Sequence, residues 1–365
     1  REALAGVLDV NGCTTMDGAD AFVHHALLRS LAPDKPVFNT AERLIPPVSI
    51  QGADAFAYVH ARLWEGAMAG LNGCLTPLGA PYAPGRESDG LLSHPECLDG
   101  FATACMDLNR LAPIVSAFQR APANVAVLWS NSSKIRDDGD PYLDSVKCAF
   151  TGCSWFGYGV RFVSERQCEE GALDAVDVFI IPKTIALTDA AFAAIDAYIQ
   201  AGGVTVRAGS FIPYNERGAS RQGVLSSTTR AILVRGADSP LNYLHGMDAA
   251  YEMGALEPVP RSVNAHGYPL EGVRSRFALA DGAPFLYLVN LRSTPVTVYL
   301  DGPYCSGRDL IGARWVGFPT VVEPNDPMLI RLDAPPEVEV AEEEAPERAI
   351  PTVALRPVGR TGSGR

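Results

Sequence analysis

The sequence predicts an α/β protein with two parallel-sheet modules followed by a small antiparallel β-domain. In residues 1–120 and again in 121–250, short apolar runs alternate with segments of helical apolar periodicity. Strands and helices that alternate in this way form parallel sheets or barrels. Residues 251–334 differ, because apolar and polar residues alternate there between closely spaced turns, which is typical of antiparallel strands.

The composition argues against several classes of function. The formal net charge of −12 argues against a general nucleic-acid-binding protein and against adsorption to anionic membranes. No apolar run approaches the ~20 residues that a membrane-spanning helix needs. The eight cysteines lack C-x-x-C spacing, so we expect unpaired thiols in a reducing, cytoplasmic compartment and no zinc site.

The first module is organised around residues 35–45, where a Lys-Pro pair precedes an apolar run that stops at the carboxylate of Glu42. This pattern predicts a buried parallel strand whose carboxyl end reaches a functional surface of the protein. Catalytic groups of α/β barrels sit at the carboxyl ends of the strands, which makes Glu42 the first candidate for chemistry. The other elements expected in this module are strands at 4–11 and 73–78 and helices at 20–31, 54–71 and 96–112, the last broken at Pro113. Because the chain does not begin with Met and opens directly on a strand-like run, we expect it to be the C-terminal part of a longer protein.

The second module has the pattern of a doubly wound, flavodoxin-like sheet. Its expected elements are strands at 125–129, 178–182 and 204–206 and helices at 143–155 and 190–199, with Gly202-Gly203 as a helix stop. The third module contains alternating runs at 285–289 and 296–300. Residues 335–365 are dominated by Pro, Glu and Ala, which predicts a disordered tail or linker.

Three stretches resemble the last third of the barrel in β-galactosidase-like glycoside hydrolases, namely family 42 and its relatives in the retaining (β/α)8 clan. They are Ala26-Leu27-Leu28-Arg29-Ser30, Lys35-Pro36-Val37-Phe38-Asn39 and Arg62-Leu63-Trp64-Glu65-Gly66-Ala67. The resemblance implies that residues 1–120 are the last strand–helix units of a TIM barrel. It also implies that 121–250 form an amidotransferase-like trimerisation domain and 251–334 a C-terminal β-domain.

The resemblance implies a function as well. Such enzymes hydrolyse a terminal β-glycosidic bond with retention, assemble as homo-oligomers such as trimers, and use no cofactor. Their acid/base Glu ends the fourth barrel strand, which would precede residue 1. The expected partner is therefore a carbohydrate, a β-galactoside or a related sugar, with no nucleic acid and no membrane.

The nucleophile position leaves three interpretations open. In the family it usually lies six residues after the Lys of the Lys-Pro pair, which falls here on Ala41 and puts Glu42 one residue late. Glu42 is the nucleophile if a bulge re-aims the strand end, because neighbouring side chains otherwise point to opposite faces. Alternatively the nucleophile has been lost to Ala41, leaving a carbohydrate-binding or assembly protein, or Glu42 is a surface carboxylate beside Arg43. We assign Glu42 as the nucleophile.

The candidate substrate-binding residues are Asp9, Asn11, Asn39 and Trp64. Asp9 and Asn11 could bind sugar hydroxyls at the end of the first strand, and the alternative is a turn-forming pair. Trp64 could stack on a sugar, and the alternative is a core position at helical spacing.

Other chemistries find no support in the sequence. The histidines His24, His25 and His60 lack metal-ligand spacing, and no nucleotide-binding glycine motif occurs. The middle module has no Cys at the turn after residues 204–209, so we expect it to lack amidotransferase activity.

Overall fold

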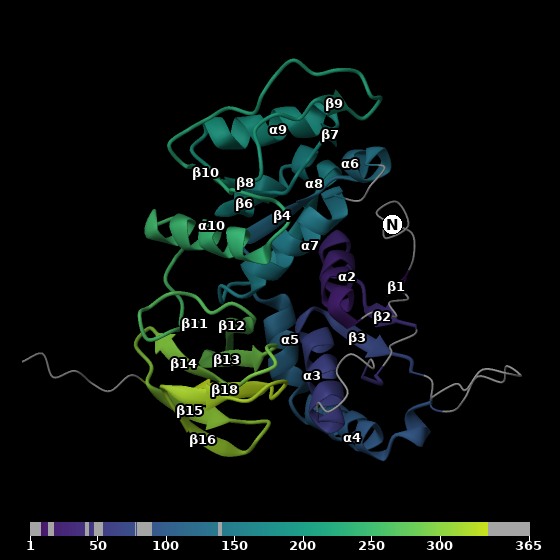
Figure 1. Cartoon of the computed structure of the whole chain (residues 1–365), viewed down its shortest axis with the longest axis vertical. Coiled ribbons are helices and arrows are strands. Elements are labelled where there is room, and N and C mark those ends of the chain that lie inside the picture. The colour runs from purple at the N-terminus through teal and green to yellow at the C-terminus, as the bar shows by residue number, and fades with distance from the viewer. Residues whose placement is uncertain are drawn as a thin grey trace, which may run out of the picture. The chain divides into compact units, whose positions relative to one another are not determined.

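The computed structural model describes residues 9–13, 18–40, 44–46, 54–76, 78, 90–137 and 141–334, so the predicted tail at 335–365 lies outside the described residues. The described chain is a mixed α/β structure with a three-stranded, a five-stranded and a small two-stranded parallel sheet, followed by antiparallel sheets (Figure 1). Each helix in these ranges is too short or too polar to cross a bilayer.

The first sheet has three parallel strands in the order β1-β2-β3. Its elements are β1 (Asn11–Cys13), α2 (Gly18–Leu31), β2 (Val37–Asn39), α3 (Ala55–Met68) and β3 (Leu71–Cys74). Most of the strand predicted at 4–11 lies outside the described residues, and the described strand β1 covers only its last residue. The helix–strand alternation expected from residue 18 onward is confirmed, and β3 begins two residues earlier than predicted. It starts early because Gly70, with φ +100°, ends α3 and leads directly into the strand.

The helix expected at 96–112 is followed immediately by a second helix instead of a loop. The structure has η2 (Leu91–Ser93), α4 (Pro95–Arg110) and α5 (Ala112–Arg120), with the break at Leu111. Pro113 lies in the first turn of α5, where its missing N–H costs nothing, so it begins a helix here rather than ending one.

The second sheet has five parallel strands in the order β10-β8-β6-β4-β5, which is second, first, third, fourth, fifth along the chain when read from the β5 edge. Its strands are β4 (Val125–Trp129), β5 (Val160–Ser164), β6 (Val178–Ile181), β8 (Val204–Arg207) and β10 (Ala231–Leu233). The helices are α6 (Asn131–Arg136), α7 (Pro141–Ser154), α8 (Glu165–Glu169), η3 (Ala172–Ala175), α9 (Asp189–Gln200) and α10 (Pro240–Glu252), and β7 (Ala186–Leu187) pairs with β9 (Tyr214–Asn215). The strands and helices expected from the sequence are confirmed, while the short elements α6, α8, η3, β7 and β9 and the longer β5, β10 and α10 were not anticipated.

Helices cover both faces of this sheet, with α9 on one side and α7 and α10 on the other (Figure 1). Alternate residues of each strand therefore enter two different cores, and the inner strand β4 is buried along its whole length. Helix α2 of the first module joins the face that holds α7, where Phe22 lies 5.5 Å from Phe150 between ring centroids. Ser30 fixes this contact, since its hydroxyl accepts a hydrogen bond of 2.9 Å from the Phe162 amide and its carbonyl accepts one of 3.0 Å from Gln167.

The third module is antiparallel, as expected. One sheet has the order β12-β13-β18-β15-β16 and the other β11-β14-β17. The strands are β11 (Arg261–Val263), β12 (Val273–Ala280), β13 (Ala283–Asn290), β14 (Val296–Asp301), β15 (Ser306–Asp309), β16 (Arg314–Gly317), β17 (Thr320–Val322) and β18 (Met328–Leu332). The outer side of the larger sheet packs on α3 and α5, which joins this module to the first one through a shared core.

Candidate active site

The carboxyl edge of the three-stranded sheet is formed by the ends of β1, β2 and β3. Asn39 pairs with Cys13 on one side and with Cys74 on the other, so the three strands end in register. The Thr40 amide and hydroxyl donate to the Cys13 carbonyl at 2.8 and 3.1 Å, and the Leu75 amide donates to the Asn39 carbonyl at 2.8 Å. In an α/β barrel this edge carries the catalytic groups.

The predicted nucleophile Glu42 and its neighbour Ala41 lie outside the described residues. The structure does describe the strand that leads to them, which ends at Asn39 and is followed by a bend at Thr40. Phe38 points to the open face of the sheet and is 36% exposed, whereas Asn39 points to the opposite face and is fully buried. The two faces of β2 are therefore clearly distinguished up to the last strand residue.

Asp9 and Asn11 do not lie at the strand end where the sequence analysis placed them. The paired strand runs from Asn11 to Cys13, so Asn11 begins it, and Asp9 lies in an exposed bend before it. The apolar run before Asp9 suggested that the strand ends earlier, but the described pairing with β2 runs from Asn11 to Cys13. Asn11 is 2% exposed, and its backbone N–H donates to the Pro36 carbonyl at 2.9 Å.

Asn39 does lie at the carboxyl edge, but its side chain shares a face with Val37, which packs against Leu28 of α2. It is therefore oriented toward the helix layer. Trp64 is also buried, with no exposed surface, and its ring lies 6.4 Å from that of Tyr287. The structure thus places Trp64 in the core, the alternative that helical spacing suggested, and leaves no accessible ring face for a sugar.

A buried charged group beside Trp64 was not anticipated. Glu65 of α3 forms an ion pair with Arg274 of β12, and the Tyr287 hydroxyl of β13 donates to its other oxygen at 2.9 Å. The Arg274 guanidinium lies 3.5 Å from the centroid of the Phe22 ring and donates to the Ser154 hydroxyl at 3.1 Å. These residues lie far apart in the sequence, so no local pattern could reveal the group. It joins all three modules, and its oxygens are already hydrogen-bonded, which makes it structural.

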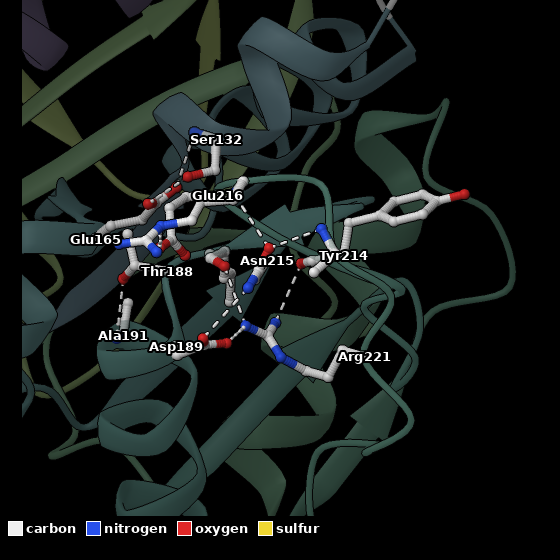
Figure 2. A network of polar contacts seen from close by, with 12 residues as sticks. Ser132, Glu165, Thr188, Asp189, Ala191, Tyr214, Asn215, Glu216 and Arg221 are labelled. Atoms are coloured by element: carbon white, nitrogen blue, oxygen red, sulfur yellow. Dashed lines mark hydrogen bonds and ion pairs between the residues drawn. The ribbon is translucent and has the colours of Figure 1, made fainter.

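A second polar network lies at the carboxyl ends of β4 and β5 (Figure 2). The Glu165 carboxylate accepts hydrogen bonds from the Ser130 hydroxyl, from the Ser132 amide at 3.0 Å and from the Ser132 hydroxyl at 2.8 Å. Close by, Arg221 donates to Asp189 at 2.5 Å, and Arg221 followed by Asn215 holds the pKa of the Asp189 carboxyl below its usual value.

This second network has no nucleophile of the amidotransferase type. Cys148 and Cys153 lie inside α7, and burial raises the pKa of both thiols, which disfavours a reactive thiolate. The serine hydroxyls at the edge donate to Glu165 or to backbone carbonyls such as that of Ala186, and no histidine contacts them among the described residues. The network therefore ties loops to the sheet.

The histidines show no metal centre, because no cluster of three potential ligands occurs within the described ranges. His60 lies 3.5 Å from Asp107, and burial lowers its pKa despite that carboxylate. His25 is 1% exposed on α2, and burial, followed by Arg62 and His24, lowers its pKa to about 3.

Burial of neutral His25 predicts a pH-dependent stability. The pKa of His25 is about 3 in the folded chain and about 6.5 when unfolded, so acid protonates the unfolded state first. The stabilisation is complete above pH ~6.5 and is lost as the pH falls toward 3, with a slope of about 1.4 kcal/mol per pH unit for one proton. We expect His25→Met to remove this slope from urea-unfolding free energies measured between pH 6.5 and 5. The exposed His266→Met is the control, and an unchanged slope in His25→Met would contradict the assignment.

Neither a protein-family model nor a curated protein matches the sequence. Solved structures do match it. The exo-carrageenase GH42 from Bacteroides ovatus has a TM-score of 0.71 and 16% identity, covering 91% of this chain and 49% of that one. The β-galactosidases from Bacillus circulans sp. alkalophilus and from Rahnella sp. R3 both have TM-scores of 0.69, at 12% and 16% identity, covering 91% of this chain and 61% of theirs.

The chain therefore spans between about half and three fifths of the length of these structures. At such low identity the likeness concerns the fold, and it extends over nearly all of the described residues. The chain shares its fold with part of the solved glycoside hydrolases of family 42.

Proposed function

We propose that this chain is the C-terminal part of a retaining β-glycosidase of the β-galactosidase type. The observation that carries the proposal is the match to solved family 42 structures across 91% of a chain that combines modules of different architecture. In this proposal residues 1–120 are the last strand–helix units of a TIM barrel, 121–250 a flavodoxin-like trimerisation domain and 251–334 a β-domain.

Two features of the sheets support these module assignments. Parallel sheets are normally covered on both faces, yet Phe38 is exposed on the face of β2 that α2 does not cover. Further barrel strands, supplied by the rest of a longer protein, would cover that face. The five-stranded sheet has the strand order 2-1-3-4-5 that characterises flavodoxin-like domains.

The proposed reaction is hydrolysis of a terminal β-galactoside or related sugar with retention of configuration. Glu42 follows the carboxyl end of β2 and would attack the anomeric carbon to form a glycosyl ester, which water then cleaves. A second carboxyl group about 5–5.5 Å away would protonate the leaving oxygen and then activate the water. That acid/base residue would lie in the part of the barrel that precedes residue 1.

The alternative is a relative that has lost catalysis and binds carbohydrate or serves assembly. Ala41 occupies the position six residues after Lys35, where the family usually has its nucleophile. Three of the four substrate-binding candidates support this alternative, since Asn11, Asn39 and Trp64 are buried, whereas Asp9 is exposed. Under either proposal the middle module supplies subunit contacts in a homo-oligomer such as a trimer.

The two proposals differ in whether a covalent sugar ester forms on the segment that holds Ala41 and Glu42. We would expose the longer protein that the proposal describes, with its whole barrel, to 2-deoxy-2-fluoro β-glycosides. These compounds trap the ester, and peptide mass spectrometry locates the adduct. A retaining hydrolase gives a sugar adduct on this peptide, and Glu42→Gln removes it. Glu271→Gln, at an exposed turn of the third module, is the control that keeps the adduct.

Lack of any adduct across a panel of β-glycosides would exclude Glu42 as the nucleophile. If an adduct then appears only after Ala41→Glu, the barrel has lost its catalysis and the alternative holds.

A further inference from the structure

A large cavity lies where the three modules meet, on the side of the molecule opposite to the candidate active site. Its volume is about 740 Å³. Several of the residues that line it come directly before parallel strands: Pro33 and Asp34 before β2, Met68 to Gly70 before β3, and Ala123 before β4. The cavity therefore opens at the amino ends of the parallel strands, whereas Glu42 follows a carboxyl end.

The wall of the cavity is strongly cationic. Five arginines line it, and the single carboxylate among its lining residues is the exposed Asp34. Of these five, Arg274 is neutralised by Glu65. The other four form no ion pair within the described part of the chain, and they are Arg29, Arg120, Arg161 and Arg276.

Two of these arginines are held in place by the fold. Arg161, at the start of β5, donates to the carbonyls of Ala123 at 3.0 Å and Ala172 at 3.2 Å. Arg276, on β12, makes one long hydrogen bond of 3.4 Å to the Ala121 carbonyl, so most of its donors remain for a ligand. Burial lowers the pKa of both guanidiniums, to about 10 for Arg276, and no carboxylate offsets that effect.

Glycines leave room for these side chains. A Cβ on Gly70 would lie 2.8 Å from Cγ of Arg29, and a Cβ on Gly159 would lie 3.2 Å from Nη2 of Arg276. The aromatic side chains of Phe22, Phe150 and Tyr158 supply an apolar part of the wall. The cavity thus combines a fixed cationic wall with apolar surface, the composition of a small-molecule site.

We propose that this cavity binds a small organic molecule that carries a phosphate or sulfate ester. Burying part of a guanidinium without a counter-ion destabilises the folded state. A tetrahedral oxyanion can accept hydrogen bonds from several guanidinium N–H groups at once. The volume is far larger than an inorganic ion needs and lies within the ~300–1,000 Å³ that small organic ligands occupy. Arg161 and Arg276 bind the ester group, while the aromatic side contacts the organic part. The proposal does not depend on Glu42 or on hydrolysis.

The test measures binding to the intact protein by calorimetry and by thermal unfolding. The probes are glucose 6-phosphate, glucose 6-sulfate, inorganic phosphate, inorganic sulfate and glucose, all at one ionic strength set with chloride. One variant combines Arg161→Gln with Arg276→Gln. The matched control is Arg235→Gln, which changes an exposed arginine that does not line the cavity. The double variant is essential, because phosphate and sulfate also stabilise proteins without a specific site.

We expect saturable binding of at least one sugar ester to the wild type and to Arg235→Gln. The ester that binds with the higher affinity shows whether the site prefers a phosphate or a sulfate group. Loss of each guanidinium should weaken binding on the order of tenfold or more. Without ligand, the double variant loses two buried positive charges and also the hydrogen bonds from Arg161 to Ala123 and Ala172, so its thermal unfolding is measured first to establish that it is folded. Equal ester affinity in the double variant and the wild type, saturation by the inorganic ions alone, or no saturable binding by any probe would overturn the proposal.

Discussion

Replacing Arg274 by methionine is expected to lower the free energy of unfolding by about 3–5 kcal/mol. The side chain is 7% exposed and pairs with Glu65, which is 4% exposed, so the substitution leaves a carboxylate buried without its counter-ion. The same change also removes the guanidinium from the face of Phe22. Urea unfolding at pH 7, followed by far-ultraviolet circular dichroism, measures the loss.

Two further variants show where this loss comes from. Arg331→Met removes an exposed arginine from β18, which lies beyond β13 in the same sheet, and should change stability by no more than about 0.5 kcal/mol. Adding Glu65→Gln to Arg274→Met removes the stranded charge and keeps an oxygen that accepts from the Tyr287 hydroxyl. It should restore most of the stability. If the double variant is as unstable as Arg274→Met, the loss arises from packing on Phe22 and not from the buried carboxylate.

Replacing Trp64 by alanine is expected to cost about 3–5 kcal/mol of unfolding free energy. Trp64 has no exposed surface and packs in the core that joins α3 to β12, β13 and α5, with its ring stacked on Tyr287 at 6.4 Å. Truncation leaves a cavity that this shared core cannot fill, and urea unfolding measures the effect. The expected loss belongs to stability, because the ring is inaccessible to a sugar.

Trp64→Phe separates a core role from a sugar-binding role. Phenylalanine keeps most of the apolar contact and removes a buried indole N–H that has no hydrogen-bond partner, so its cost should be well below that of alanine. A weakened affinity for a β-galactoside at unchanged stability would contradict the core placement. Trp315→Phe, which changes a tryptophan of β16 that is 67% exposed, provides the comparison for surface changes.

The sequence by itself determined the order and type of the main elements. Continuous apolar runs such as 125–129 and 178–181 are strands buried on both faces, and the structure places them at the centre of a parallel sheet. Gly202 ends α9 with φ +95°, as its place in the sequence indicated. Signals of this kind are local, because periodicity and turn residues act on neighbouring positions.

The ends of helices and strands were harder to predict from the sequence, because they depend on which other segments they pair with or pack against. The end of β1 at Cys13 follows from its pairing with β2, and that pairing places Asp9 and Asn11 before the strand end. Pro113 has the sequence features of a helix stop and begins α5 instead, since packing on the β-domain favours a second helix.

Only the tertiary structure decided which polar residues are brought together. Glu65 and Tyr287 are separated by 222 positions, and the arginines around the cavity come from helices and strands of three modules. Nothing in the local sequence of Arg161 or Arg276 distinguishes them from surface arginines. Burial, and the absence of an ion-paired carboxylate among the described residues, set their chemistry, and both arise when distant segments pack against one another.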